Sequence, residues 1–386
     1  MNVIRTYYIL TIVIESSGSL HKSSRVTDIY HSSLFERRDD QGSTGEKYEK
    51  CQEDVRMLSG KTILVTGGTG SFGHQFIKYV LENYEPKKII IYSRDEYKQF
   101  IMRNEFKKYD EKLRFFIGDV RDRERLYRAF EGVDYVVHAA ALKQVPACEY
   151  NPIEAVRTNI DGAVNIIDAA LDKGVKRVVA LSTDKAVNPI NLYGGTKLVS
   201  DKLFVSANAY AGVKDVSFSI VRYGNVAGSR GSVIPFFRDI VKNGGTELPI
   251  TDYRMTRFWI SLEEGVQLVI KALTEAKGGE TFISKIPSFK ITDLAQAILP
   301  GCKMPEVGIR EGEKLHEIMV TEEDSMSTYE YDKHFIVYPH MDWWNPDKIQ
   351  AGGKKVEQGF AYSSDKNTEW LSVEQMQELL KQVEEH

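Results

Sequence analysis

The residues best suited to acid–base chemistry lie in one short stretch of the chain. Thr183, Asp184 and Lys185 follow a run of β-branched residues, and Tyr193 and Lys197 come a few positions later. Because Tyr193 and Lys197 are four residues apart, they share one face of a helix. An ammonium group favours the ionised form of a neighbouring phenol, so we expect Lys197 to lower the pKa of Tyr193. Such a pair can take a proton from a substrate hydroxyl while hydride leaves the same carbon.

Asp184 and Lys185 place a further acid and a further base beside that pair. Oxidation of an alcohol needs only the group that activates the hydroxyl. Two more proton-transfer groups therefore predict a second reaction, such as the removal of water. The alternative interpretation is an ion pair that only braces the loop.

A glycine-rich segment predicts a dinucleotide site. It lies between a strand-like run and a helix-like one, and its glycines have the spacing G-x-x-G-x-x-G. Glycine permits a tight turn and lets a pyrophosphate approach the backbone and the helix N-terminus closely. The alternative is a purely structural turn. The residues of this segment expected to bind the cofactor are Gly67, Thr69, Gly70, Ser71, Phe72 and Gly73.

The end of the next strand-like run favours NADP over NAD. NAD sites usually have an acidic residue there, which binds the ribose 2′-hydroxyl. Here Ser93 and Arg94 hold that place, followed by Asp95 and Lys98. A hydroxyl and two cations suit a 2′-phosphate, although Arg94 and Lys98 could also be solvated surface residues. Further cofactor contacts are expected after the following two strand-like runs, from Asp119, Val120, Ala139, Ala140 and Ala141.

A parallel sheet would bring all these residues to one edge. Short, nearly continuous apolar runs alternate with helix-like segments, which is typical of strands buried on both faces. The predicted fold is therefore α/β, a Rossmann-type doubly wound parallel sheet with a smaller C-terminal substrate-binding lobe. The strand-like runs cover 61–66, 88–93, 113–117, 133–138, 177–182 and 216–221, and helices are expected within 75–84, 123–130 and 155–171.

We expect three parts along the chain. After an apolar patch that ends at Ile14, the chain up to residue 56 is polar and turn-rich, so residues 1–56 are expected to be a disordered or loosely packed N-terminal extension; a targeting or partner-binding tail is the alternative. Residues 57–225 form the predicted NADP-binding Rossmann domain. Residues 226–386, punctuated by Gly and Pro, form the predicted substrate-binding lobe, whose segments can interleave with the sheet. A final helix is expected with Ser372 as its N-cap.

The composition excludes several classes of protein. The chain has 386 residues with 51 Lys+Arg against 55 Asp+Glu, which is not the basic excess of a nucleic-acid binder. The early apolar run 7–14 is too short to span a bilayer and lacks the features of a signal peptide. Three cysteines without close pairing and scattered histidines predict neither a disulfide scaffold nor a metal site. We expect a cytoplasmic protein with no nucleic-acid or membrane partner.

The glycine-rich turn, the strand ending in Ser-Thr and the Tyr-x-x-x-Lys pair together resemble the extended short-chain dehydrogenase/reductases. Longer segments resemble, more specifically, the configuration-inverting UDP-N-acetylglucosamine 4,6-dehydratases of pseudaminic acid biosynthesis. The similarity begins near Met57, and the first 56 residues have no counterpart. The segments that carry it are 66–73, 92–98, 118–122, 138–146, 182–197, 222–232, 255–260 and 308–317.

This resemblance implies a reaction on UDP-N-acetylglucosamine. Tyr193 would help deprotonate the 4-hydroxyl as hydride passes from C4 to NADP, and Lys185 would act as base at C5. Asp184 would be the acid that assists loss of the C6 hydroxyl as water. Return of hydride to C6 and reprotonation of C5 on the opposite face would give UDP-2-acetamido-2,6-dideoxy-β-L-arabino-hexos-4-ulose. The retaining dehydratases have a glutamate where this chain has Lys185, which favours the inverting assignment.

The resemblance also implies contacts outside the catalytic stretch. It assigns substrate binding to Lys143, Asn225, Arg257 and Arg310. It further implies a homo-oligomer, such as a hexamer, and flagellin as the final glycan acceptor.

Two other functions share these features. A nucleotide-sugar 4-epimerase has the same fold and the same Tyr/Lys pair, but epimerisation needs no acid and base for dehydration. Asp184 and Lys185 therefore argue against it. A non-catalytic NADP-binding regulator would commonly lack the Tyr/Lys pair, which is intact here.

Overall fold

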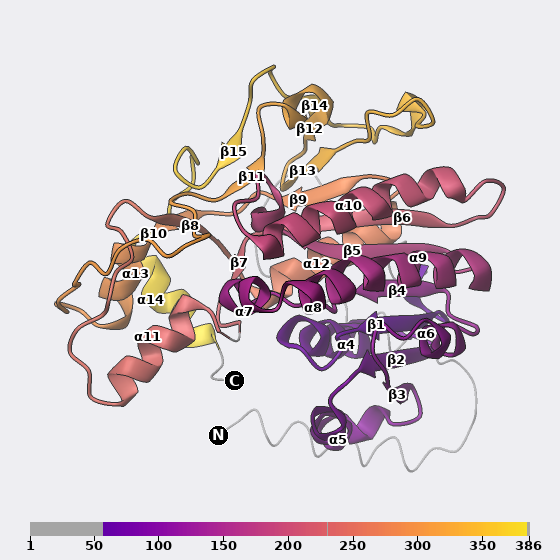
Figure 1. Cartoon of the computed structure of the whole chain (residues 1–386), viewed down its shortest axis with the longest axis horizontal. Helices are drawn as coiled ribbons and strands as arrows, with labels where there is room; N and C mark the ends of the chain where they lie inside the picture. The colour runs from indigo at the N-terminus through magenta and orange to yellow at the C-terminus, as the bar shows by residue number, and fades with distance from the viewer. Residues whose placement is uncertain (1–56, 230, 384–386) are drawn as a thin grey trace, which may run out of the picture. The chain divides into compact units, whose positions relative to one another are not determined.

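The computed structural model describes residues 57–229 and 231–383. The predicted N-terminal extension, residues 1–56, lies outside the described residues. In the described part of the chain the largest sheet has ten strands, in the order β14-β12-β13-β9-β6-β5-β4-β1-β2-β3 (Figure 1). Neighbouring strands from β3 across to β9 are parallel, whereas β13, β12 and β14 continue the sheet antiparallel. The order β3-β2-β1-β4-β5-β6 is that of a doubly wound dinucleotide-binding fold, which confirms the predicted fold class.

The parallel strands lie close to their expected positions. Strands β2 and β3 have the expected bounds, and β4 begins two residues later than expected because its hydrogen-bonded ladder starts at Tyr135. The strands of the large sheet are β1 Thr62–Thr66, β2 Lys88–Ser93, β3 Leu113–Ile117, β4 Tyr135–His138, β5 Arg177–Thr183, β6 Ser217–Tyr223, β9 Thr281–Ser284, β12 Thr328–Glu330, β13 His334–Val337 and β14 Lys354–Lys355.

Two helical layers cover the parallel strands. Successive residues of β1 face opposite sides: Ile63 and Val65 pack in one core cluster, and Leu64 packs in another. The first cluster includes residues of α4 and α12, and the second includes residues of α6, α9 and α10. Figure 1 shows α9 and α10 crossing one face of the sheet. The helices of these layers are α4 Ser71–Asn83, α5 Glu96–Glu105, α6 Arg123–Ala129, α9 Gly162–Lys173, α10 Leu192–Tyr210 and α12 Leu262–Glu275.

The single helix expected within 155–171 is interrupted. A short helix, α8 (Pro152–Val156), follows α7 (Val145–Tyr150), and a π-helical turn at Arg157–Asp161 leads into α9. The turn directs Asn159 inward, where its side chain bonds both backbone groups of Leu142 and the hydroxyl of Thr196. The interruption therefore ties the segment after β4 to helix α10.

The C-terminal half contributes to two regions. Strands β9, β12, β13 and β14 extend the large sheet, while a smaller sheet has the order β10-β8-β7. Three helices pack with the smaller sheet around Phe237, Trp259 and Leu294. The expected boundary at residue 225 stays a prediction. The remaining elements are β7 Asn225–Val226, β8 Thr256–Ile260, β10 Ser288–Lys290, β11 Ile318–Val320, β15 Tyr362–Ser363, α11 Val233–Lys242, α13 Ile291–Ile298 and α14 Val373–Gln382.

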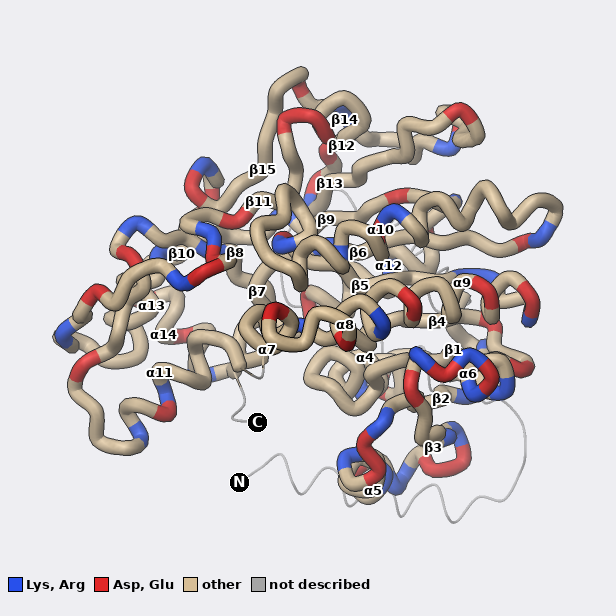
Figure 2. Tube along the Cα trace, viewed as in Figure 1, with Lys and Arg blue, Asp and Glu red and all other residues tan. Residues whose placement is uncertain are grey.

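Helix α14 begins where expected, because Ser372 forms a capping box with Gln375. No helix among the described residues is long and apolar enough to cross a bilayer. Figure 2 shows Lys and Arg interspersed with Asp and Glu, mostly along helices and connecting loops, while β1 and β4 carry no charged residue. The charged residues Asp184 and Lys185 directly follow β5, next to the uncharged strand β4.

Candidate active site

Asp184 and Lys185 lie at the carboxyl end of the central strand β5. They form a 3₁₀ turn in which the Thr183 hydroxyl accepts a hydrogen bond from the Lys185 backbone N–H and donates one to Asp184 Oδ1. Lys185 Nζ is 3.0 Å from Asp184 Oδ1. The Asp184 side chain is completely buried, whereas that of Lys185 keeps 24% of its surface exposed. The lysine is therefore the member of the pair that is open to a ligand.

A second carboxylate, which the sequence analysis did not identify, meets the same ammonium group. Glu317 Oε1 lies 3.2 Å from Lys185 Nζ, and the Glu317 side chain is 2% exposed. Arg257 Nε is 3.7 Å from the same oxygen. The site thus contains a cluster of two carboxyl groups and one ammonium group, and the guanidinium of Arg257 lies next to Glu317.

The charges in this cluster shift one another's pKa values. Burial and the Glu317 carboxylate raise the pKa of Asp184, despite the opposing effect of Lys185. Burial lowers the pKa of Lys185, but Asp184 and Glu317 outweigh it, so the net pKa is above its ordinary value. Burial would raise the pKa of Glu317, yet Lys185, Arg257 and Lys314 bring it below its ordinary range. In the resting site, Lys185 is an ammonium ion and Asp184 is the carboxyl group that more readily holds a proton.

Tyr193 and Lys197 lie in the first two turns of α10, as the sequence predicts. The Asn191 side chain caps this helix by accepting a hydrogen bond from Gly194 N at 2.8 Å. The expectation that Lys197 lowers the pKa of Tyr193 is wrong. Burial raises the pKa of Tyr193 to about 12, and the groups that oppose this rise are Lys185 and Thr183.

Lys197 instead shares its environment with a buried aspartate. Burial lowers the pKa of Lys197, and Asp201, one turn further along α10, opposes that change. Asp201 Oδ2 accepts a hydrogen bond from the Ser182 hydroxyl at 2.5 Å. Asp201 therefore anchors the catalytic helix to the end of β5.

The glycine-rich turn has the shape that a bound pyrophosphate requires. Gly67 has φ of +65°, and a Cβ at this position would lie 2.9 Å from Ala140 N. A Cβ on Gly73 would lie 2.6 Å from Gly68 Cα, so only glycine lets α4 begin this close to β1. Helix α4 starts after Gly70 without a side-chain cap or an acidic residue in its first turn. Its N–H groups can therefore bind phosphate, and these residues fit a dinucleotide.

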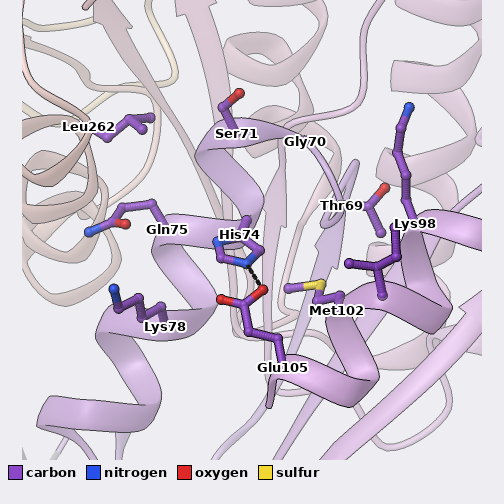
Figure 3. Close-up of a pocket in the computed structure, with 11 residues that line it drawn as sticks. Thr69, Gly70, Ser71, His74, Gln75, Lys78, Lys98, Met102, Glu105 and Leu262 are labelled. Atoms are coloured by element: carbon purple, nitrogen blue, oxygen red, sulfur yellow. Dashed lines mark hydrogen bonds and ion pairs between the residues drawn. The ribbon is translucent and has the colours of Figure 1, made fainter. Parts of the chain in front are cut away.

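A pocket of about 270 Å³ lies next to this turn, between α4 and α5. Figure 3 shows Thr69, Ser71 and Lys98 around it, with His74 bonded to Glu105 across its floor at 2.7 Å. The structure thus brings together the glycine-rich turn and one of the two cations expected to bind a 2′-phosphate.

The residues at the end of β2 and just after it form hydrogen bonds and ion pairs within the chain. The Ser93 hydroxyl accepts a hydrogen bond from Gln99 Nε2 at 2.9 Å. Lys98 Nζ is 3.0 Å from Asp95, and Arg94 is 3.8 Å from Asp119. Arg94 and Lys98 both keep about half of their side-chain surface exposed, at 57% and 46%. Their binding to a cofactor stays a prediction.

Comparison with known proteins identifies the family. Residues 63–339 match the model of a family described as polysaccharide biosynthesis protein. The chain belongs to this family.

Three proteins similar to this chain are nucleotide-sugar enzymes. The UDP-N-acetylglucosamine 4,6-dehydratase (inverting) of Campylobacter jejuni is 55% identical, covering 85% of this chain and 99% of the relative. A UDP-glucose 4-epimerase of Rickettsia canadensis is 41% identical, covering 84% and 96%. The structure of dTDP-glucose 4,6-dehydratase from Streptomyces venezuelae with NAD bound has a TM-score of 0.59 at 25% identity, covering 66% and 86%. The resemblance to the inverting dehydratases and the extended short-chain dehydrogenase/reductases is thus confirmed.

The residues assigned to substrate in this family member occupy different settings. Asn225 begins β7, next to Gly224, whose Cβ position is 3.3 Å from Asp184 Oδ2. The Asn225 amide oxygen is buried and accepts no hydrogen bond from the described residues, so it can accept one from a ligand. Lys143 and Arg310 are exposed, and Arg310 pairs with Glu313 at 3.0 Å.

Arg257 is buried and already engaged. Its guanidinium donates hydrogen bonds to three backbone carbonyls, those of Thr256, Lys314 and Leu315. It thereby fixes the segment that carries Glu317 into the site. Contact between Arg257 and a substrate pyrophosphate stays a prediction, as do the contacts of Lys143, Asn225 and Arg310.

Glu317 and Lys314 are the site residues that sequence reasoning missed. Both lie in the segment 308–317, from which only Arg310 was selected. Lys314 Nζ is 3.4 Å from the Asp184 carbonyl oxygen and also bonds the Val187 carbonyl. The density of charged residues from Arg310 to Glu317 was the one available signal, because nothing in the sequence shows that this segment reaches β5.

Proposed function

We propose that this protein is an NADP-dependent UDP-N-acetylglucosamine 4,6-dehydratase that inverts C5. The observation that carries the proposal is the Asp184–Lys185 pair, with Nζ 3.0 Å from Oδ1, directly after the strand that precedes the Tyr193 helix. The proposal is supported by 55% identity to an inverting enzyme over almost its whole length.

Each ionisable group has a distinct task in this reaction. A bound nicotinamide dinucleotide would accept a hydride from C4 and return it to C6, and its oxidised ring would favour the Tyr193 phenolate. Tyr193 takes the proton of the sugar 4-hydroxyl, and the resulting 4-keto group makes the C5 proton acidic. Lys185 removes that proton. Asp184, whose pKa is raised by burial and by Glu317, protonates the C6 hydroxyl as it leaves.

The choice of NADP follows from the residues after β2. Arg94 and Lys98 are the first two cations in the sequence after the strand end, both are exposed, and Lys98 lines the pocket beside the glycine-rich turn. No acidic residue occupies the strand end itself, where the sequence is Ser93-Arg94. A solved relative at 25% identity binds NAD, so the cofactor preference needs its own test.

Other parts of the proposal rest on the family resemblance. We propose a cytoplasmic homo-oligomer, such as a hexamer, that forms UDP-2-acetamido-2,6-dideoxy-β-L-arabino-hexos-4-ulose as the first step of pseudaminic acid biosynthesis. In that pathway, flagellin would be the final acceptor.

A 4-epimerase is the second candidate, because a UDP-glucose 4-epimerase is 41% identical to this chain. Incubation of the purified protein with NADP and UDP-N-acetylglucosamine distinguishes the two. A UDP-linked 4-keto-6-deoxy sugar, lighter than the substrate by one water, supports the dehydratase. UDP-N-acetylgalactosamine alone supports the epimerase, and tight cofactor binding without turnover supports a regulator.

A pair of lysine variants controls this experiment. Lys185→Ala should abolish formation of the keto sugar. Lys176→Ala should not, because Lys176 precedes the opposite end of β5 and pairs with the exposed Asp215.

A further inference from the structure

The 308–317 segment, which carries Glu317, is hydrogen-bonded to other parts of the chain at several points. Its backbone N–H donates to the Ser364 hydroxyl at 2.9 Å, and its carbonyl accepts from Ser364 N at 2.8 Å. Earlier in the same segment, the Gly312 carbonyl accepts a hydrogen bond from Asn191, the N-cap of the Tyr193 helix, at 2.7 Å. The segment that carries Glu317 is thus bonded to Ser364 and to the N-cap of the helix that carries Tyr193.

The Glu317 carboxylate lacks the partners that a buried carboxylate normally has. Its Oε2 atom, like Asp184 Oδ2, is buried and has no hydrogen bond from any described residue. Only Oε1 is engaged, by Lys185 at 3.2 Å and by Arg257 at 3.7 Å. Leaving a buried acceptor unpaired costs free energy, so such a group calls for a functional explanation.

Charged and titratable side chains face this cluster from several elements. Asp184 and Lys185 come from the turn after β5, and Tyr193 comes from α10. Arg257 comes from β8, and Lys314 and Glu317 come from the 308–317 segment. Next to these groups, Asp201 of α10 acts on Tyr193, and Glu313 lies 3.7 Å from Arg257.

The proposed function leaves one proton unassigned. Lys185 rests as an ammonium ion between the carboxyl groups of Asp184 and Glu317, and it must lose a proton before it can remove one from C5. If Asp184 is to protonate the leaving hydroxyl, it already holds its own proton and cannot take another. Glu317 is the remaining carboxylate within hydrogen-bond distance of Lys185 Nζ among the described residues.

We infer that Glu317 is a positioning residue for Lys185: it is the ionised carboxylate opposite the ammonium group at rest, and it receives the lysine proton before Lys185 acts as a base. The inference rests on the proposed function. The N–H bond of Lys185 breaks as an O–H bond forms on Glu317. Neutral Lys185 then takes the C5 proton, and Asp184 gives its proton to the departing hydroxyl. The summed charge of the three side chains stays at zero throughout, which suits a buried site.

The test uses Glu317→Gln, which keeps the shape of the side chain and removes its ability to accept the proton. Exchange of the C5 proton with deuterated water should fall on the order of 100-fold, the usual contribution of a positioned acid–base group. Oxidation at C4, followed as reduced nicotinamide in a single turnover, should persist. The acid limb of the pH profile should move to higher pH, because Lys185 would have to lose its proton to solvent.

Two variants serve as controls. Glu317→Asp keeps a carboxylate and should keep the acid limb in its wild-type position at a lower rate. Glu280→Gln removes an equally buried carboxylate, which accepts hydrogen bonds from the backbone N–H groups of Lys277 and Gly278. It should leave the pH profile unchanged.

The outcomes separate the inference from the proposed function. Wild-type C5 exchange and an unmoved acid limb in Glu317→Gln would overturn the inference alone. Equal losses of C4 oxidation and C5 exchange would also overturn it, since they indicate only a structural role. If Glu317→Gln does not fold, an acid limb moved upward in Glu317→Asp would contradict the inference. Failure of the wild-type protein to dehydrate UDP-N-acetylglucosamine would instead overturn the proposed function.

Discussion

Helix α10 and the Asp184–Lys185 turn touch at a glycine, so one added methyl group should separate them. Gly194 follows Tyr193, and a Cβ at this position would lie 2.9 Å from the Lys185 carbonyl carbon and 3.0 Å from Pro189 Cβ. It would also meet the Lys185 carbonyl oxygen at less than 3.0 Å, a separation that real Cβ atoms essentially never show. The backbone of one element must therefore move.

Gly194→Ala should lower both stability and activity. Overpacking of this kind costs about 1–3 kcal/mol, whereas an ordinary Gly→Ala change within a helix gains about 0.5–1 kcal/mol. The neighbouring Gly195 provides that reference, because, apart from its chain neighbours and the nearby backbone of α10, no atom of the described residues lies within 4 Å of its Cβ position. The two variants should thus differ by about 1.5–4 kcal/mol in free energy of unfolding. Displacement of Tyr193 from Lys185 by about 1 Å should cost on the order of 100-fold in dehydration rate.

Urea unfolding and the dehydration rate, measured on both variants, test this prediction. Gly195→Ala should be at least as stable as the wild-type protein and should keep its activity. A Gly194→Ala protein that matched Gly195→Ala in both measurements would refute the packing of α10 against the catalytic turn.

Three further perturbations test other parts of the site. Arg94→Ala should weaken NADPH binding by about 10–100-fold and leave NADH binding nearly unchanged, as measured by fluorescence titration. Equal losses of affinity for NADPH and NADH would exclude a contact between Arg94 and the 2′-phosphate. Arg257→Lys keeps the charge but loses the guanidinium that bonds three carbonyls, so the free energy of unfolding in urea should fall by about 1.5–3 kcal/mol. An unchanged unfolding midpoint would be inconsistent with that role. Burial, with Lys197, lowers the pKa of His138 from 6.5 to about 3, so below about pH 6.5 the unfolded chain binds a proton that the folded chain does not. Stability should therefore fall as pH decreases toward 3, by up to about 1.4 kcal/mol per unit from His138 alone, and His138→Phe should remove that part of the slope.

Local sequence patterns were sufficient for the parallel half of the sheet. Strand β2 has the expected bounds because a continuous apolar run flanked by polar turns has few other ways to be buried. Strand β3 also has the expected bounds, although it lies at the edge of the sheet and keeps Arg114 and Ile117 exposed. The turn at Gly67 and the cap at Ser372 were also predictable, since each depends on residues next to it in the chain.

Features that depend on distant partners could not be predicted in the same way. The addition of β9, β13, β12 and β14 to the sheet depends on pairing between short strands, which no local pattern specifies. Glu317 lies 132 positions after Lys185, and only the fold brings the two within 3.2 Å. The effect of Lys197 on Tyr193 was misjudged because helical spacing gives proximity but not burial, and burial dominates the pKa of Tyr193.

The most direct test of the account is an NMR time course of the wild-type protein with NADP and UDP-N-acetylglucosamine in deuterated water. If Tyr193, Lys185 and Asp184 act as described, the product is a 4-keto-6-deoxy sugar with deuterium at C5 and inverted configuration there. Conversion to UDP-N-acetylgalactosamine with the original hydrogen retained at C5 would contradict it.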